Sequence, residues 1–130
     1  MIYQVTANLA VDRIEPSIAF FEKVGFEVSV QVPEDDHIGF AILVHGSNQV
    51  MLQTRTCLIA DDAAFAAAAA TGPVMLFITV PSLADIVAKL EGQTIILKER
   101  ETFYGAKEVT YSEPGGHFVT FAEFAEQETE

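Results

Sequence analysis

The side chains of this sequence that could carry out chemistry are few and widely spaced. There are three histidines, His37, His45 and His117, and a single cysteine, Cys57. Each histidine falls in a turn or at the start of a predicted strand, which favours an exposed or turn-stabilising role. Cys57 has no second cysteine with which to form a disulfide or a metal cage, and no basic neighbour activates its thiol. We therefore expect a buried bystander thiol in a reducing cytoplasm.

Glu108 is the catalytic candidate that the residue types allow. A carboxylate removed from water beside aromatic residues such as Tyr104 and Tyr111, with Gln53 completing the site, could act as a general base. The competing interpretation places Glu108 on the solvated side of a charged hairpin, and the neighbouring charges favour it. Those charges are Lys98, Glu99, Arg100, Glu101 and Lys107.

The composition excludes several classes of partner. The 130 residues include 19 acidic and 7 basic ones, for a net charge of −12. Phosphate binding needs clustered lysine and arginine, so we expect no nucleic-acid partner. The acidic surface either attracts cationic ligands or simply maintains solubility. The sequence shows no secretory leader and no apolar run long enough to span a membrane, so we expect a bacterial-type cytoplasmic protein with no membrane partner.

An internal repeat organises the chain. Each half reads as a strand, a helix and three further strands, and a glycine, Gly25 or Gly92, ends each predicted helix. Pro16 marks the start of the first helix, and Ser82 with Asp85 forms a capping box for the second. The predicted strands are 5–11, 26–32, 38–44, 49–54, 74–80, 94–100, 107–112 and 117–123.

The repeat predicts an α+β fold in which two tandem β-α-β-β-β modules form a curved, mixed-sheet cup. We expect a first module over 1–55, a linker with a short helix over 56–72, a second module over 73–125 and an acidic tail over 126–130, within one structural domain overall. The short helix follows the acidic pair Asp61 and Asp62.

Strand alternation assigns the faces of the sheets. The apolar set of each first strand, Val5 to Val11 and Val74 to Val80 at alternate positions, must pack under its helix. The other positions form an inner face of apolar and neutral polar groups, which is typical of a small-molecule cavity. The alternative is that this face packs against a partner subunit or the other module. The predicted ligand-binding residues are Asn8, Phe40, Met51, Gln53, Phe77, Phe103, Tyr104, Tyr111, Phe118 and Thr120.

Three stretches of the sequence resemble the vicinal oxygen chelate superfamily, which includes glyoxalase I, extradiol dioxygenases, fosfomycin-modifying enzymes and bleomycin resistance proteins. Residues 9–12 with 17–26 resemble its opening strand and helix. Residues 103–109 resemble its aromatic-Gly hairpin, and 113–121 resemble its Asp-Pro-x-Gly turn and last strand. The order and extent of these matches imply the fold, whereas one fold here serves many reactions.

The metal enzymes of the superfamily bind a divalent ion with His, Glu or Gln, and the resemblance transfers those positions to this chain. They fall on Thr6, on Met51 or Gln53, on Met75 and on Thr120. Thr and Met are poor ligands for a hard divalent ion. Glu123 is close in sequence, but alternation points it away from Thr120. We therefore expect no metal and no other cofactor.

Two function hypotheses follow from the resemblance. The first is a metal-independent protein that sequesters a hydrophobic or aromatic, cationic small molecule, as in bleomycin resistance. The second is a glyoxalase-like lyase or isomerase, or a dioxygenase-related enzyme, with a rebuilt active site. The resemblance also implies a two-fold homodimer, with or without exchange of modules between subunits through the segment 57–72.

Overall fold

The computed structural model describes residues 1–125, and the predicted acidic tail over 126–130 lies outside the described residues. The chain divides into two compact units, Met1–Gly72 and a second that begins at Pro73. The segment predicted to be a linker is part of the first unit. No helix of the described residues is long and apolar enough to cross a membrane.

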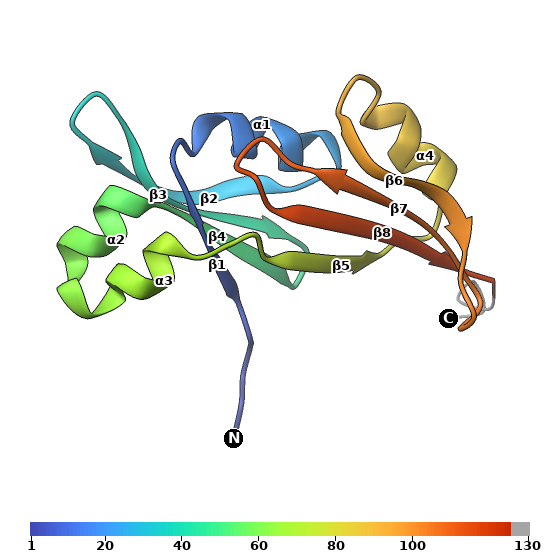
Figure 1. Cartoon of the computed structure of the whole chain (residues 1–130), viewed down its shortest axis with the longest axis horizontal. Coiled ribbons are helices and arrows are strands. Elements are labelled where there is room, and N and C mark those ends of the chain that lie inside the picture. The colour runs from blue at the N-terminus through green and yellow to red at the C-terminus, as the bar shows by residue number, and fades with distance from the viewer. Residues whose placement is uncertain (126–130) are drawn as a thin grey trace. The chain divides into compact units, whose positions relative to one another are not determined.

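The first unit begins with the predicted strand, helix and three strands (Figure 1). Its sheet has the order β1-β4-β3-β2, in which β1 pairs with β4 in parallel and the other pairs are antiparallel. These elements are β1 (Ala7–Val11), α1 (Glu15–Lys23), β2 (Glu27–Glu34), β3 (His37–His45) and β4 (Asn48–Thr54).

The second unit repeats this topology. Its sheet has the order β5-β8-β7-β6, again with one parallel pair, β5 with β8, and two antiparallel pairs. The elements are β5 (Met75–Thr79), α4 (Leu83–Lys89), β6 (Thr94–Glu101), β7 (Ala106–Ser112) and β8 (Phe118–Phe124). The α+β class and the two tandem modules are confirmed.

The segment after β4 contains more helix than the sequence predicts. It forms α2 (Arg55–Asp61), the short 3-10 helix η1 (Ala63–Phe65) and α3 (Ala66–Ala70). The carboxylate of Asp62 accepts a hydrogen bond from the backbone N–H of Ala64 (2.8 Å), as expected for an acidic cap. The hydroxyl of Thr54 caps α2 by accepting from Cys57 N–H (3.0 Å), so the last residue of a strand also begins a helix.

One face of each sheet packs under a helix and forms the core. In the first sheet this face carries the fully buried Leu9, Val11, Leu43 and Leu52, and α1 lies along it (Figure 1). In the second sheet the corresponding buried residues are Val109, Tyr111, Val119 and Phe121, with Leu83 and Leu90 of α4. We call the opposite face of each sheet its inner face.

Two expected core residues are not in the core. Val5 and Val74 precede the first register-paired residues of β1 and β5, and both side chains are exposed. The alternation rule applies only where a strand is paired, and pairing begins at Ala7 and Met75.

Candidate functional site

The inner face of the first sheet carries a set of mutually paired polar side chains. Strand register places Asn8 beside Met51, and Phe40 beside Gln53, on this face. Asn8 Nδ2 donates to Gln53 Oε1 (2.9 Å), and Gln53 Nε2 donates in turn to the thiol sulfur of Cys57 (3.3 Å). These amides therefore satisfy one another and present a neutral surface.

The inner face of the second sheet is built by β5, β7 and β8. The register pairs Phe77 with Thr120, and Thr110 with the same Thr120, so these three side chains lie side by side. The Thr110 and Thr120 hydroxyls are hydrogen bonded to each other (2.7 Å) and both residues are buried. Phe118, opposite Met75, continues the face toward the start of β8.

Glu108 lies on this inner face and is the charged group at its centre. Register places it opposite Ala122, and it is only 3 % exposed. One carboxylate oxygen accepts a hydrogen bond from the Tyr104 hydroxyl, and the other lies 3.6 Å from Nη2 of Arg100. The interpretation of Glu108 as a solvated hairpin residue is therefore wrong, because β7 is an interior strand between β6 and β8.

The hydrogen bond to Glu108 has an electrostatic consequence for Tyr104. This bond, together with desolvation, raises the pKa of Tyr104 above its ordinary value of 10.0. The hydroxyl therefore keeps its proton at neutral pH and stays a donor to the carboxylate. Gly105, with φ of 86°, makes the turn that brings Tyr104 over β7.

A row of aromatic rings extends from Tyr104, the hydrogen-bond partner of this carboxylate. Tyr104 and Phe124 have ring centroids 6.0 Å apart, and Phe124 and Phe77 are 6.4 Å apart. Phe103 packs edge-on against Tyr104 at 5.0 Å. Several of these large apolar side chains remain open to solvent, including Phe77 at 53 % and Met75 at 67 % exposure.

This arrangement suits the binding of an organic cation. An aromatic ring attracts a cation to its face, and a buried carboxylate attracts it more strongly. Exposed rings also offer apolar area to a flat ligand. The nearby guanidinium of Arg100 is more than half exposed at its side chain, so a ligand cation can replace it beside Glu108 while Arg100 turns to water.

The positions where the superfamily places metal ligands do not fit a metal ion. In the first unit Thr6 Oγ1 accepts a hydrogen bond from Gln49 Nε2 (3.1 Å), and in the second unit the Thr120 hydroxyl is paired with Thr110. Met51 and Met75 offer only thioethers, which are poor ligands for hard divalent ions. Among residues 1–125 no group of three or more His, Cys, Asp or Glu side chains is arranged to hold a metal.

The histidines divide into different environments. His117 is 1 % exposed and its Nδ1 accepts a hydrogen bond from the backbone N–H of Val74 (2.8 Å), so an exposed role for it is wrong. His45 is exposed at the end of β3 beside the ring of Phe26. His37 is half-buried between two carboxylates.

The structure places most of the predicted ligand-binding residues on the inner faces of the two sheets. Asn8, Phe40, Met51 and Gln53 share the inner face of the first sheet, and Phe77, Phe118 and Thr120 share that of the second. Phe103 and Tyr104 lie in the turn between β6 and β7.

Tyr111 is a correction to this set. It is opposite Val119 on the helix-covered face, packs edge-on against Phe121 (5.9 Å) and is 1 % exposed, so it is a core residue.

Three residues of the site were not predicted from the sequence. Phe124 follows Phe118, Thr120 and Ala122 in the same alternation, so strand parity indicates it once β8 is extended by one residue. The same alternation along β7 places Thr110 on the same face as Glu108. Arg100 carries no such signal, because the β6–β7 register is irregular between Leu97 and Arg100.

Neither family models nor curated protein sequences match this chain. Solved structures match over nearly its whole length. A lactoylglutathione lyase from Agrobacterium tumefaciens is 16 % identical, with a TM-score of 0.74 over 95 % of this chain and 95 % of that one. A bleomycin resistance determinant encoded on the transposon Tn5 is 16 % identical, with a TM-score of 0.68 over 95 % of this chain and 99 % of its own. A bleomycin-binding protein complexed with bleomycin is 16 % identical, with a TM-score of 0.66 over 94 % and 98 % of the two chains. At these identities the likeness shows the fold and leaves the activity to the site.

Proposed function

We propose that this chain, whose fold is that of the vicinal oxygen chelate superfamily, is a metal-independent protein that sequesters a small aromatic, cationic molecule. The observation that carries the proposal is the inner face of the second sheet. There the buried carboxylate of Glu108 accepts a hydrogen bond from the exposed Tyr104, and a row of rings leads from Tyr104 through Phe124 to the exposed Phe77. A net charge of −12 assists the approach of a cation from a distance.

Sequestration requires no reacting group, and the described residues of this face fit that requirement. The hydroxyls of Thr110 and Thr120 are used on each other, and the Tyr104 hydroxyl is used on Glu108. A ligand therefore gains mainly from apolar contact with rings and from charge attraction to Glu108, which are sources of affinity that leave the ligand unchanged.

Titration calorimetry with bleomycin, the ligand of one structural neighbour, tests the proposal directly. We expect saturable binding, and a Phe77→Ala variant should weaken it by about two- to thirteenfold, since loss of one aromatic contact costs about 0.5–1.5 kcal/mol. Phe65→Ala is the matched control, because Phe65 is an exposed phenylalanine in the first unit. Absence of binding to bleomycin and to a panel of planar aromatic cations would contradict the proposal.

The enzyme hypothesis keeps one specific observation in its favour. Glu108 is buried beside aromatic rings, which is the environment that a general base in this fold requires. Mass spectrometry of the recovered ligand separates the two functions. An unchanged ligand supports sequestration. Metal-free turnover of a hemithioacetal or an epoxide that is lost in Glu108→Gln would support a lyase instead.

We further propose that the protein pairs with a second copy in the cytoplasm. Ile95, Ile96 and Leu97 on the edge strand β6 are all exposed, as are Ile2 and Tyr3 before β1. Exposed apolar edges of this kind favour association. The single free thiol of the chain suits a reducing compartment. Light scattering on the purified protein should give the mass of two chains, and the mass of one chain would contradict the pairing.

A further inference from the structure

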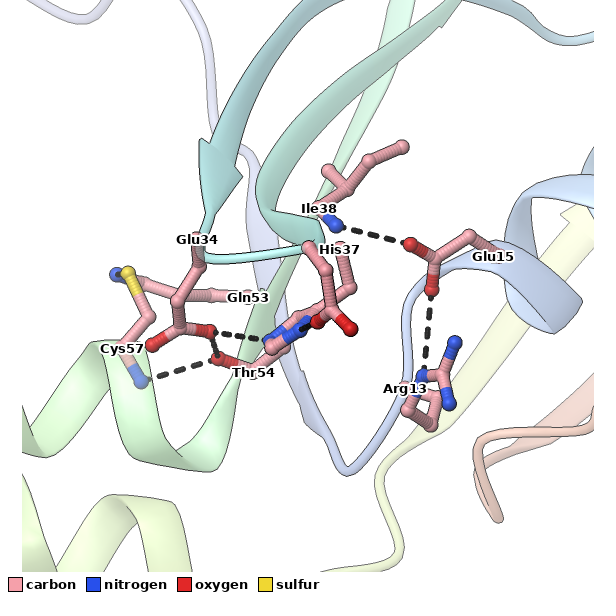
Figure 2. A network of polar contacts seen from close by, with 9 residues as sticks. Arg13, Glu15, Glu34, His37, Ile38, Gln53, Thr54 and Cys57 are labelled. Carbon is pink, nitrogen blue, oxygen red and sulfur yellow. Dashed lines mark hydrogen bonds and ion pairs between the residues drawn. The ribbon is translucent and has the colours of Figure 1, made fainter.

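A second polar cluster lies in the first unit, at the turn between β2 and β3. His37 is placed between two carboxylates, with Nε2 3.0 Å from Glu34 Oε1 and Nδ1 3.1 Å from Asp36 Oδ1 (Figure 2). A neutral imidazole carries one N–H and can donate to only one of them, whereas the imidazolium donates to both. The geometry therefore matches the protonated ring.

Glu34 connects this histidine to the start of a helix. The same Oε1 that faces His37 accepts a hydrogen bond from the Thr54 hydroxyl (2.7 Å), and the Thr54 oxygen accepts from Cys57 N–H (3.0 Å) (Figure 2). Thr54 is the N-cap residue of α2, and its side-chain oxygen makes the capping hydrogen bond. The end of β2, the start of β3 and the first turn of α2 thus share one hydrogen-bonded chain.

We propose that His37 is a proton-sensitive latch that, when protonated, fixes Glu34 against Thr54 and so holds the first turn of α2 closed. A neutral ring carries its single N–H on either nitrogen, and the tautomer with the proton on Nδ1 donates to Asp36 and no longer to Glu34. In that tautomer Glu34 is held by the Thr54 hydroxyl alone. The carboxylate of Glu34 then holds the Thr54 hydroxyl less firmly, and the hydrogen bond from Cys57 N–H to the Thr54 oxygen weakens.

The charges around His37 support the protonated form. Glu34 faces it from β2 and Asp36 from the turn. On the side of α1, Glu15 accepts from Ile38 N–H (2.8 Å), and Arg13 lies 3.5 Å from Glu15. On the side of α2, Arg55 is paired with Asp12 (3.1 Å). Acidic groups therefore dominate the immediate surroundings of the ring.

The direction of the pH effect follows from these contacts. The hydrogen bonds to Asp36 and then Glu34 raise the pKa of His37 above its ordinary value of 6.5. A raised folded-state pKa means that the stabilising contribution is fully present below pH 6.5 and is lost as the pH rises through the folded-state pKa. The latch is closed in mild acid and opens toward alkaline pH.

The latch also reaches the inner face of the first sheet. Cys57 belongs to the first turn of α2, and its sulfur accepts the hydrogen bond of Gln53, which is paired with Asn8. A movement of this turn therefore changes the hydrogen bond from Gln53 to Cys57, and with it the position of the Asn8–Gln53 pair on that face.

NMR on the full chain tests the proposal. The His37 ring should titrate with a midpoint above 6.5. Exchange of the Cys57 amide hydrogen, corrected for its intrinsic pH dependence, should rise by about two- to tenfold through the same midpoint, the effect of losing one hydrogen bond. His37→Gln should abolish this step because glutamine does not titrate. His45→Gln is the matched control and should keep it.

Two variants of Thr54 test the connection itself. Thr54→Val should remove the step at Cys57 while the His37 ring still titrates with a midpoint above 6.5, and that raised midpoint shows that the β2–β3 turn of the variant is folded. Thr54→Ser, which keeps the hydroxyl, should retain the step. A step that persists in His37→Gln, or an exchange rate at Cys57 with no step in the natural protein, would overturn the latch.

Discussion

The Glu113 turn before β8 gives the sharpest test of the described geometry, because this turn sets the register of the strand that carries Phe118 and Thr120. Glu113 is 1 % exposed, and its two carboxylate oxygens accept from the backbone N–H groups of Gly115 (2.8 Å) and His117 (2.9 Å). In Glu113→Ala both N–H groups lose their acceptor.

The magnitude follows from the burial of the two donors. A hydrogen bond to a carboxylate contributes about 1.5–3 kcal/mol when its partner cannot turn to water. The donor at His117 is buried, whereas Gly115 is only half-buried and regains water. Glu113→Ala should therefore lower the free energy of unfolding by about 2–4 kcal/mol. With an m value of about 2 kcal/mol/M, the urea midpoint should fall by about 1–2 M.

Urea titration followed by circular dichroism measures this change. Glu91→Ala, at an exposed glutamate after α4, is the matched control and should stay within about 0.5 kcal/mol of the natural protein. Glu113→Gln, which keeps one acceptor oxygen, should fall between the two. If Glu113→Ala were as stable as the Glu91 control, the carboxylate would not hold the turn and the reasoning would fail.

Four further outcomes are expected. Tyr111→Ala should lower the free energy of unfolding by about 3–5 kcal/mol in denaturant titration, as for a core aromatic residue. Asp35→Gly should raise thermal stability by up to about 1 kcal/mol, because Asp35 has φ of 57°, a region that glycine enters without strain. The hydrogen bond from Ile38 lowers the pKa of Glu15 below 4.5, so its contribution is present above pH 4.5 and lost as the pH falls through the lowered pKa. In Glu15→Gln the free energy of unfolding, measured by denaturant titration at several pH values, should therefore fall less between pH 4.5 and more acidic pH than in the natural protein. Divalent zinc, nickel or manganese should change the melting temperature by less than about 1 °C, and a saturable stabilisation would contradict the assignment of the four metal positions.

Strand alternation explains why much of the site was predictable from the sequence. Once β8 is recognised, Val119 and Phe121 must face the helix, and this places Thr120 on the inner face. The same parity points Glu123 away from Thr120. This is confirmed, because Glu123 accepts a hydrogen bond from Leu83 N–H at the start of α4 (2.8 Å).

The environment of Glu108 was not predictable from its sequence neighbours. The charges from Lys98 to Glu101 belong to β6, an edge strand whose residues are all exposed. Glu108 belongs to β7, which has a strand on either side, so its carboxylate is shielded although the hairpin is rich in charge. Local composition describes the hairpin, whereas burial depends on which of its two strands is at the edge.

His117 illustrates a long-range effect of the same kind. Its partner, the backbone N–H of Val74, is 43 residues earlier in the chain, and only the parallel pairing of β5 with β8 brings the two together. A histidine in a glycine-rich turn is indistinguishable by local sequence from an exposed one. Tyr111 is a different case. It is two residues after the apolar Val109 on β7, so alternation along the strand is sufficient to place it on the helix-covered face.

The polar groups of the inner faces constrain what kind of affinity this fold can provide here. Asn8 and Gln53 are bonded to each other, as are Thr110 and Thr120, so part of their hydrogen-bonding capacity is already used and a ligand can exchange for these bonds. Such an exchange contributes little net free energy. The exposed rings of Phe77 and Tyr104 can gain apolar contact without breaking a hydrogen bond, whereas a cation at Glu108 takes the place of Arg100. Affinity on the second sheet should therefore rise with the aromatic area and the positive charge of the ligand. A neutral ligand that binds mainly through hydrogen bonds should therefore bind this face more weakly than an aromatic cation of similar size.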